Sequence, residues 1–250
     1  MAFLIGVIAF VSEYADSSLG MGYGTVLSPV LLLMGYPASK VVPAILASQF
    51  VTDVAACLFH HRCRNVNLKI HSMDFKIALV LGLVSCAGVL FSVVVVLKIP
   101  TAILTLYIGA LVFCMGALIL LTTKKNIFFS WPKILGLSFL AAFNKGVSGG
   151  GYGPLVMGGQ ILSGVHAKNA VGITAFAEAL TCLLGFLLYC LLGKAMDWGL
   201  IALLVASAVL AVPFAALTVK NFDQGLLKRV VGVTICCLGA LMLSKVFFSN

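Results

Sequence analysis

The chain has 250 residues, of which 62% are hydrophobic and only 9% are charged, against roughly 25% charged residues in a soluble domain. This composition and a mean hydropathy of +1.18 exclude an ordinary soluble enzyme and favour a protein whose exterior faces lipid. The net charge of +9 does not indicate nucleic-acid binding, because the basic residues are scattered over short segments between apolar runs. We therefore expect a single transmembrane domain over residues 1–250, with the lipid bilayer as its surroundings.

Eight long apolar runs follow one another along the chain, and six have a length suited to one crossing, for which about 20 residues are needed. The runs are Ala2–Met34, Val41–Phe59, Phe75–Leu97, Thr101–Leu121, Ile134–Leu162, Ala170–Leu192, Trp198–Val219 and Val230–Phe248. The first and fifth runs are too long for one crossing, and each is interrupted by a glycine-rich polar stretch. We therefore predict an all-α polytopic membrane protein in which these two runs are broken or re-entrant helical hairpins.

The two glycine-rich stretches match each other. A shift of 129 residues superimposes four residues of the first on four of the second, namely Gly20, Gly22, Tyr23 and Gly24 on Gly149, Gly151, Tyr152 and Gly153. This match and the shared layout of the later runs predict an internal repeat, with repeat 1 over residues 1–122 and repeat 2 over residues 123–250. Each repeat is expected to contain one glycine-rich hairpin followed by three transmembrane helices.

The distribution of basic residues predicts how the repeats are oriented. Lysine and arginine favour the cytoplasmic side, and they gather in segments 60–74, 122–133 and 220–229, whereas Lys40, Lys98, Lys194 and Lys245 are isolated. Placing the three basic segments inside requires both hairpins to enter the membrane and return on the side from which they came. Each repeat then has an odd number of crossings, so the two repeats are inverted. Inverted repeats with broken helices are a layout of secondary transporters.

The motifs Asn144–Gly146 and Gly149–Pro154 resemble those of the sulfite exporter TauE/SafE family of membrane permeases. The resemblance extends over essentially the whole chain, although Met21 stands where the family often has another glycine. It implies a secondary transporter, and more specifically an exporter, of a small sulfur-containing oxyanion such as sulfite or an organosulfonate. It also implies a multi-pass protein of a prokaryotic plasma membrane.

The backbone after each break is a candidate anion site. The chain becomes helical again after Gly24 and after Gly153, so two helix N-termini should point inward with free N–H groups. Glycines would let these groups approach a ligand closely, although they would equally allow close helix packing. The predicted substrate-binding shell is Gly22, Tyr23, Gly24, Asn144, Lys145, Ser148, Gly150, Gly151, Tyr152 and Gly153. The two tyrosines could gate the site, donate an O–H or only fill the core.

Ionisable residues at membrane depth indicate function. Lys145 and Asp16 hold equivalent positions in the two repeats, and Lys145 is expected to bind the oxyanion or to form a structural ion pair with Asp16. Gln49 and Glu178 are also equivalent. Glu178 is expected to carry a coupling proton or to line the polar path, with a hydrogen-bonded structural acid as the alternative. Structural roles are expected for two further acids, Glu13 and Asp53.

No catalytic residue, metal site or cofactor is predicted. The four histidines fall in or beside loops and are expected at the membrane interface, namely His60, His61, His71 and His166. The segment Gly146–Gly149 matches the G-x-S-G of rhomboid proteases, but a serine nucleophile needs a histidine base within reach, which the sequence does not supply nearby. We therefore predict a transporter and not an enzyme. A passive anion channel with the same pore is the remaining alternative, and the oligomeric state is not indicated.

Overall fold

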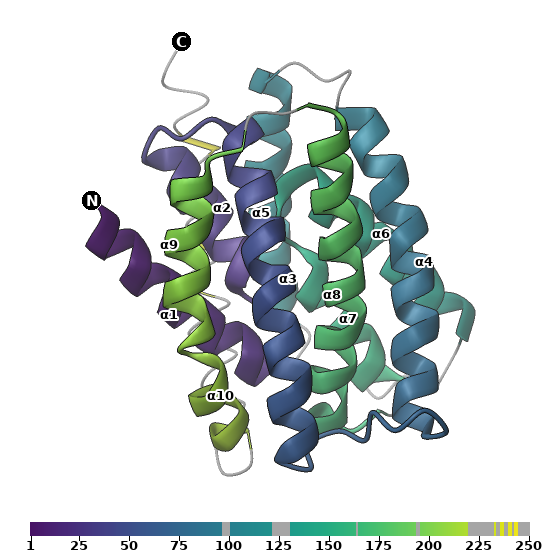
Figure 1. Ribbon diagram of the computed structural model, residues 1–250. Helices are drawn as coiled ribbons and strands as arrows, with labels where there is room; N and C mark the ends of the chain where they lie inside the picture. Colours follow the sequence, from purple (N-terminus) through teal and green to yellow (C-terminus); the bar gives the residue numbers. More distant parts are fainter. Residues whose placement is uncertain are drawn as a thin grey trace.

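The computed structural model describes residues 1–96, 101–121, 131–163, 165–193, 196–219 and a few positions between 233 and 244. Within this part of the chain every regular element is a helix (Figure 1). Five segments of the described chain are long and apolar enough to cross a membrane. The predicted all-α polytopic fold is therefore confirmed. The helices are α1 (Ala2–Leu19), α2 (Tyr23–Leu33), α3 (Ala38–Arg62), α4 (Met73–Val96), α5 (Thr101–Leu121), α6 (Trp131–Ser148), α7 (Tyr152–Leu162), α8 (Ala167–Leu191), α9 (Trp198–Val209) and α10 (Val212–Thr218).

Both long apolar runs are broken at their glycine-rich stretches, between α1 and α2 and between α6 and α7. Four glycines turn the chain there, and they have positive φ angles: 69° at Gly20, 138° at Gly22, 76° at Gly149 and 80° at Gly151. A residue with a Cβ rarely adopts these conformations. Gly20 and Gly22 are the repeat equivalents of Gly149 and Gly151, so the two breaks use glycine in the same two places.

Helices α3 and α8 lie side by side at the centre of the molecule, with α4 against α8 and α9 against α3 (Figure 1). The central pair is antiparallel. Leu46, in the middle of α3, lies against Gly185 near the end of α8, whereas Cys57 near the end of α3 shares a cluster with Ala175 near the start of α8. The centre of the fold is thus built from the helix that follows each hairpin.

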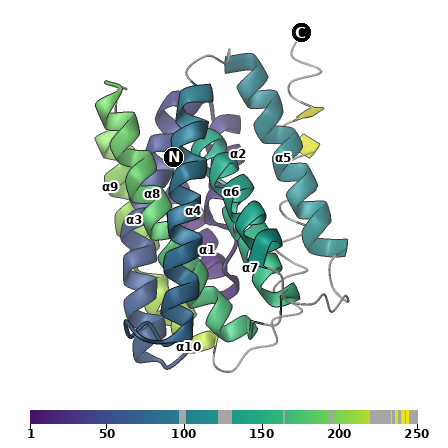
Figure 2. The same cartoon turned by 90° about the vertical axis from the view of Figure 1, so that its right-hand side faces the viewer.

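Each hairpin packs its first helix along a helix from the other half of the chain. In one case α6 runs parallel to α4, because Ser85 contacts the carbonyl of Ser138 and the later residue Ser92 lies against Gly146. In the other case α1 runs parallel to α9 and α10, because Gly6 lies against Ser207 and Tyr14 donates a hydrogen bond to Thr218. Figure 2 shows α6 and α7 beside α4, with α5 outside them.

The ends of the helices show where each hairpin enters. Lys40 at the start of α3 pairs with Asp197 before α9, which marks one end of the molecule. Asn169 at the start of α8 bonds Asp74 at the start of α4, which marks the opposite end. Helix α1 runs with α9 and α6 runs with α4, so the two hairpins enter from opposite ends. Inverted repeats would account for these directions, and we propose that the two halves are related in this way.

Two details differ from the prediction. The run Trp198–Val219 was expected to be one continuous helix, but it is divided between α9 and α10 near Pro213, which has no N–H to continue the hydrogen-bond ladder. His60 was expected at the interface, but it is fully buried, and its Nε2 lies 2.8 Å from the carbonyl oxygen of Ser17. The predicted crossing Val230–Phe248 lies almost wholly outside the described residues. The same holds for eight of the basic residues used to predict orientation, Lys98, Lys124, Lys125, Lys194, Lys220, Lys228, Arg229 and Lys245.

Candidate functional site

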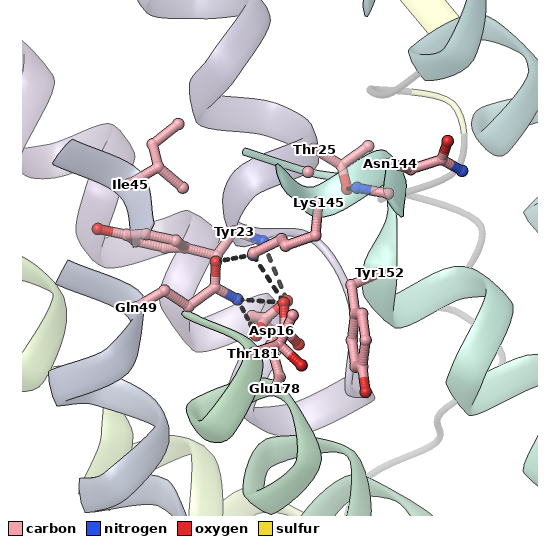
Figure 3. A network of polar contacts seen from close by, with 12 residues as sticks. Asp16, Tyr23, Thr25, Ile45, Gln49, Asn144, Lys145, Tyr152, Glu178 and Thr181 are labelled. Atoms are coloured by element: carbon pink, nitrogen blue, oxygen red, sulfur yellow. Dashed lines mark hydrogen bonds and ion pairs between the residues drawn. The ribbon is translucent and has the colours of Figure 1, made fainter. Parts of the chain in front are cut away.

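A network of buried charged and amide side chains occupies the centre of the fold (Figure 3). The Nζ atom of Lys145 lies 2.7 Å from Oε1 of Glu178 and also donates to Oε1 of Gln49. The Nε2 atom of Gln49 donates to Oε1 of Glu178 at 2.8 Å and to Oδ2 of Asp16 at 3.4 Å. All four side chains belong to residues that are at most 6% exposed. The network therefore joins α1, α3, α6 and α8 away from solvent.

The ion pair in this network corrects one expectation. Lys145 pairs with Glu178, and not with Asp16, which was its expected structural partner. The reason lies in the break of the first hairpin. Asp16 Oδ1 accepts the backbone N–H of Tyr23 at 3.1 Å, so its carboxylate is held at the N-terminus of α2, where the helix dipole favours negative charge. Gln49 then lies between Asp16 and the lysine.

Two positions that the 129-residue shift pairs with each other meet in the network. Gln49 and Glu178 are 129 residues apart, which is the shift that aligns the two glycine motifs, and their side chains are directly bonded. A direct contact between equivalent residues is expected where a two-fold axis passes between them. The pair therefore lies near the centre around which the two hairpins are arranged.

The two glycine-rich breaks cross each other by direct backbone contact. A Cβ atom on Gly24 would overlap the carbonyl oxygen of Gly149, and a Cβ atom on Gly153 would overlap the carbonyl oxygen of Gly20. The 129-residue shift exchanges these two contacts. A Cβ on Gly150 would lie 2.7 Å from the backbone of Gly24. For these glycines the close-packing alternative is therefore realised, because the opposite hairpin fills the space where a side chain would stand.

Several backbone donors expected to bind an anion have protein acceptors in this structure. The N–H of Gly150 donates to Oγ of Ser148 at 3.0 Å, and the N–H of Gly151 donates to Oγ1 of Thr25 at 3.1 Å. The N–H of Tyr23 is held by Asp16, as described above. An anion at this crossing would have to replace these oxygen acceptors.

The remaining predicted site residues are anchored to neighbouring helices. Tyr23 shares a hydrogen bond of 2.9 Å with Ser48, and Tyr152 shares one of 2.8 Å with Ser85. Asn144 accepts a hydrogen bond from the hydroxyl of Tyr107. The hydroxyl of Ser148 donates to the backbone carbonyls of Asn144 and Gly150, at 2.8 and 3.1 Å, and these contacts hold the serine of the protease-like motif against its own loop.

Beside the network lies a small cavity of about 10 Å³, roughly the room of one water molecule. The acids Asp16, Asp53 and Glu178 line it. Its other walls are Ser17, Gly20, Val171, Thr174 and Ala175. Glu13 is also buried next to this region and accepts a hydrogen bond of 2.6 Å from Ser17. Four carboxylates are thus gathered at the end of α1.

Comparison with known proteins identifies the family of the chain. The family model described as Sulfite exporter TauE/SafE matches residues 4–242. The chain belongs to this family. A curated relative, the "Probable membrane transporter protein YtnM" of Bacillus subtilis (strain 168), is 24% identical over 257 residues, which cover 97% of this chain and 83% of the relative. No solved structure matches the chain.

Membership of the TauE/SafE family confirms the resemblance read from the glycine motifs and shows that the protein is a multi-pass membrane transporter. Sequence reasoning missed Thr25 and Thr174 at the centre of this transporter, and it expected only a structural role for Asp53, which lines the cavity. Asp53 offered a signal, because a carboxylate inside an apolar run is rare. The two threonines offered none, since threonine is common in membrane helices.

Proposed function

We propose that this TauE/SafE transporter moves a small sulfur-containing oxyanion, such as sulfite or an organosulfonate, by alternating access, and that Lys145 binds the anion. The observation that carries the proposal is the burial of this lysine. Lys145 is 1% exposed and is the only buried lysine or arginine among the residues that the structure describes. A lysine in the middle of a membrane costs about 3 kcal/mol on the insertion scale, so its retention there points to a function.

The partners of Lys145 are the groups that an oxyanion would replace. The ammonium has three donors, and two of them are directed at Glu178 and Gln49. An oxyanion offers several acceptor oxygens in a similar space. It would also attract the N–H groups of the glycine breaks, now held by Thr25 and Ser148. The predicted shell around Gly22–Gly24 and Gly150–Gly153 is therefore retained as the proposed site.

The way in which the hairpins meet supports alternating access. They enter from opposite ends of the molecule and touch at their glycine breaks, so movement of either hairpin would open the centre toward one side. The backbone contact of Gly24 with Gly149 and of Gly153 with Gly20 leaves no space between the breaks, so an anion that binds there would require the crossing to separate. Inverted repeats around a site near the midplane are the usual architecture for such a cycle. Export is the direction that the family description favours.

The test measures ligand-induced stabilisation of the purified protein by sulfite and sulfoacetate, because a ligand that binds only the folded state raises its stability. We expect Lys145→Met to lose the response and Lys145→Arg to keep part of it, because the positive charge remains. Lys40→Met is the control, since this lysine lies at the surface in an ion pair with Asp197. The proposal fails if Lys145→Met responds to the anion as the wild type does. Flux into vesicles that rises linearly with anion concentration would indicate a channel instead.

A further inference from the structure

We propose that the cavity at the end of α1 is a binding site for a small hard cation, sodium, held by the carboxylates of Asp16, Asp53 and Glu178. Its position beside the Lys145 network would couple the binding of sodium to the binding of the anion. That role in transport rests on the function proposed above, whereas binding of the cation does not.

The first argument is the balance of charge. Four of the seven aspartates and glutamates in the chain are buried together, namely Glu13, Asp16, Asp53 and Glu178. Lys145 pairs with one of them, which leaves three carboxylates without a lysine or arginine partner among the described residues. Uncompensated negative charge in an apolar interior is strongly unfavourable. The cluster therefore has to take up positive charge from solution.

The second argument is an unsatisfied atom at the cavity. Oδ2 of Asp53 has no hydrogen-bond partner among the described residues, although Asp53 is only 2% exposed. Buried polar atoms are nearly always bonded, so an exception needs an explanation. Asp53 lines the cavity together with Asp16 and Glu178. A cation in the cavity would satisfy this oxygen and would draw the three carboxylates together.

The geometry suits one cation without its full hydration shell. A carboxylate oxygen of Asp53 and one of Glu178 lie within 4.8 Å of each other and of the sulfur of Cys182, and Asp16 lines the same cavity as the two acids. The cavity has room for about one water-sized particle. Thr174 adds a hydroxyl oxygen, which already accepts from Nε2 of Gln160 and retains a lone pair. The C-terminal end of α1 contributes the negative end of its dipole, as half-helix ends do at cation sites of secondary transporters.

These dimensions favour sodium over the alternatives. Carboxylate, hydroxyl and carbonyl oxygens suit hard cations. Magnesium gives up its waters reluctantly and usually keeps several of them, for which a cavity of about 10 Å³ has no room. Calcium takes six to eight oxygen ligands, which is more than this small group supplies without rearrangement. Potassium is larger than sodium and would have to push the walls of the cavity apart.

The third argument comes from the repeat, because the acids and the threonine of the cavity have no acidic or hydroxyl counterparts at the positions that the 129-residue shift pairs with them. The 129-residue shift replaces Glu13, Asp16, Asp53 and Glu178 by Ala142, Lys145, Cys182 and Gln49. It also replaces Thr174 by Ile45, whose side chain lies 3.3 Å from where a Cβ of Gly149 would stand. One side of the centre thus gathers the acids and a threonine around a cavity, whereas the other holds the lysine, with Ile45 in place of the threonine. A cation on Glu178 would weaken its hold on Lys145 and free the lysine for an oxyanion.

The test is the melting temperature of the purified full chain in sodium gluconate, against potassium and N-methylglucamine gluconate at equal ionic strength, at pH 7 and pH 8.5. Gluconate keeps inorganic anions out of the comparison. We expect a saturable rise specific to sodium, on the order of 5 °C at a hundredfold excess over Kd. Asp53→Asn should abolish the rise and Thr174→Val should reduce it. Asp197→Asn, which removes a surface ion pair and keeps an oxygen that can cap α9, should retain it.

The outcomes separate this proposal from the proposed function. Equal melting temperatures of the wild type in all three salts at both pH values would overturn the sodium site, and would mean that protons balance the acids. A sodium response that persists in Asp53→Asn would overturn the assignment of the residues, as would an equal response to calcium or magnesium chloride in a separate titration. A sodium response that disappears in Asp53→Asn, in a protein that binds no sulfur oxyanion, would support the cation site and refute only the substrate.

Discussion

The pairing of Lys145 with Glu178 can be tested by removing the two charges singly and together. The two side chains lie 2.7 Å apart and are at most 3% exposed, so water cannot replace a lost partner. Lys145→Met leaves Glu178 as a buried carboxylate whose remaining donor is the amide of Gln49. Breaking a buried ion pair by removing one partner costs about 3–5 kcal/mol. For a chain of this size, that corresponds to a loss of roughly 6–20 °C in melting temperature.

The double variant Lys145→Met with Glu178→Gln should regain most of this loss, because replacing both members of a buried pair by neutral groups is often close to neutral. We expect a coupling free energy above about 2 kcal/mol, whereas independent sites add to within about 0.5 kcal/mol. The assay is thermal or denaturant unfolding of all four proteins in one detergent, without added anion.

A second double-mutant cycle combines Lys145→Met with Asp16→Asn. It tests whether the lysine is coupled to Asp16, as the repeat suggested, or to Glu178, as in the structure. Asp16 reaches the lysine only through Gln49, so its coupling should be clearly smaller than that of Glu178. Additive losses in the Glu178 cycle, or a larger coupling in the Asp16 cycle, would refute the pairing described here.

Two further predictions concern the crossing and the topology. Gly24→Ala should abolish transport and lower stability, because the new Cβ would overlap the carbonyl oxygen of Gly149. The control is Gly158→Ala, which has nothing within 4 Å of its Cβ and should leave vesicle flux and the melting temperature unchanged. Wild-type flux through Gly24→Ala would argue against the backbone crossing. Ser39 and Lys69 lie at opposite ends of the molecule. In a cysteine-free background, Ser39→Cys should react with an impermeant thiol reagent from outside, and Lys69→Cys should react with it from the cytoplasm. Labelling of both from one side would contradict the helix directions.

The fold was largely predictable because a bilayer leaves few options for a backbone. Apolar runs of this length must be helical to bond their own N–H and C=O groups, and glycine-rich interruptions at equivalent places indicate breaks. The break between α9 and α10 had a signal in Pro213, which lacks the N–H that a continuous helix would use, but Pro29 and Pro43 lie inside unbroken helices, so a proline alone does not locate a break. A count of apolar residues alone passes over such a proline.

The contacts of the site were less predictable. The 129-residue shift identified Lys145 as the equivalent of Asp16, but equivalence does not tell which partner a side chain reaches. That depends on where α2 begins, because the N–H of Tyr23 holds the Asp16 carboxylate. Asp53 approaches Glu178 only through the antiparallel packing of α3 on α8, two helices far apart in the chain. Local sequence patterns do not predict a contact between residues so far apart in the chain.

The different charges at equivalent positions bear on how a transporter of this shape could arise. In a symmetric dimer of identical halves, each residue at the two-fold axis faces its own copy, so two buried aspartates or two buried lysines would repel each other across the centre. Joining both halves in one chain removes that restriction. Asp16 and Lys145 can then differ in sign although they occupy matching places, and Gln49 can bond Glu178 where two glutamates would otherwise meet. A chain that joins two related halves can thus hold an asymmetric centre that a symmetric dimer of identical halves cannot.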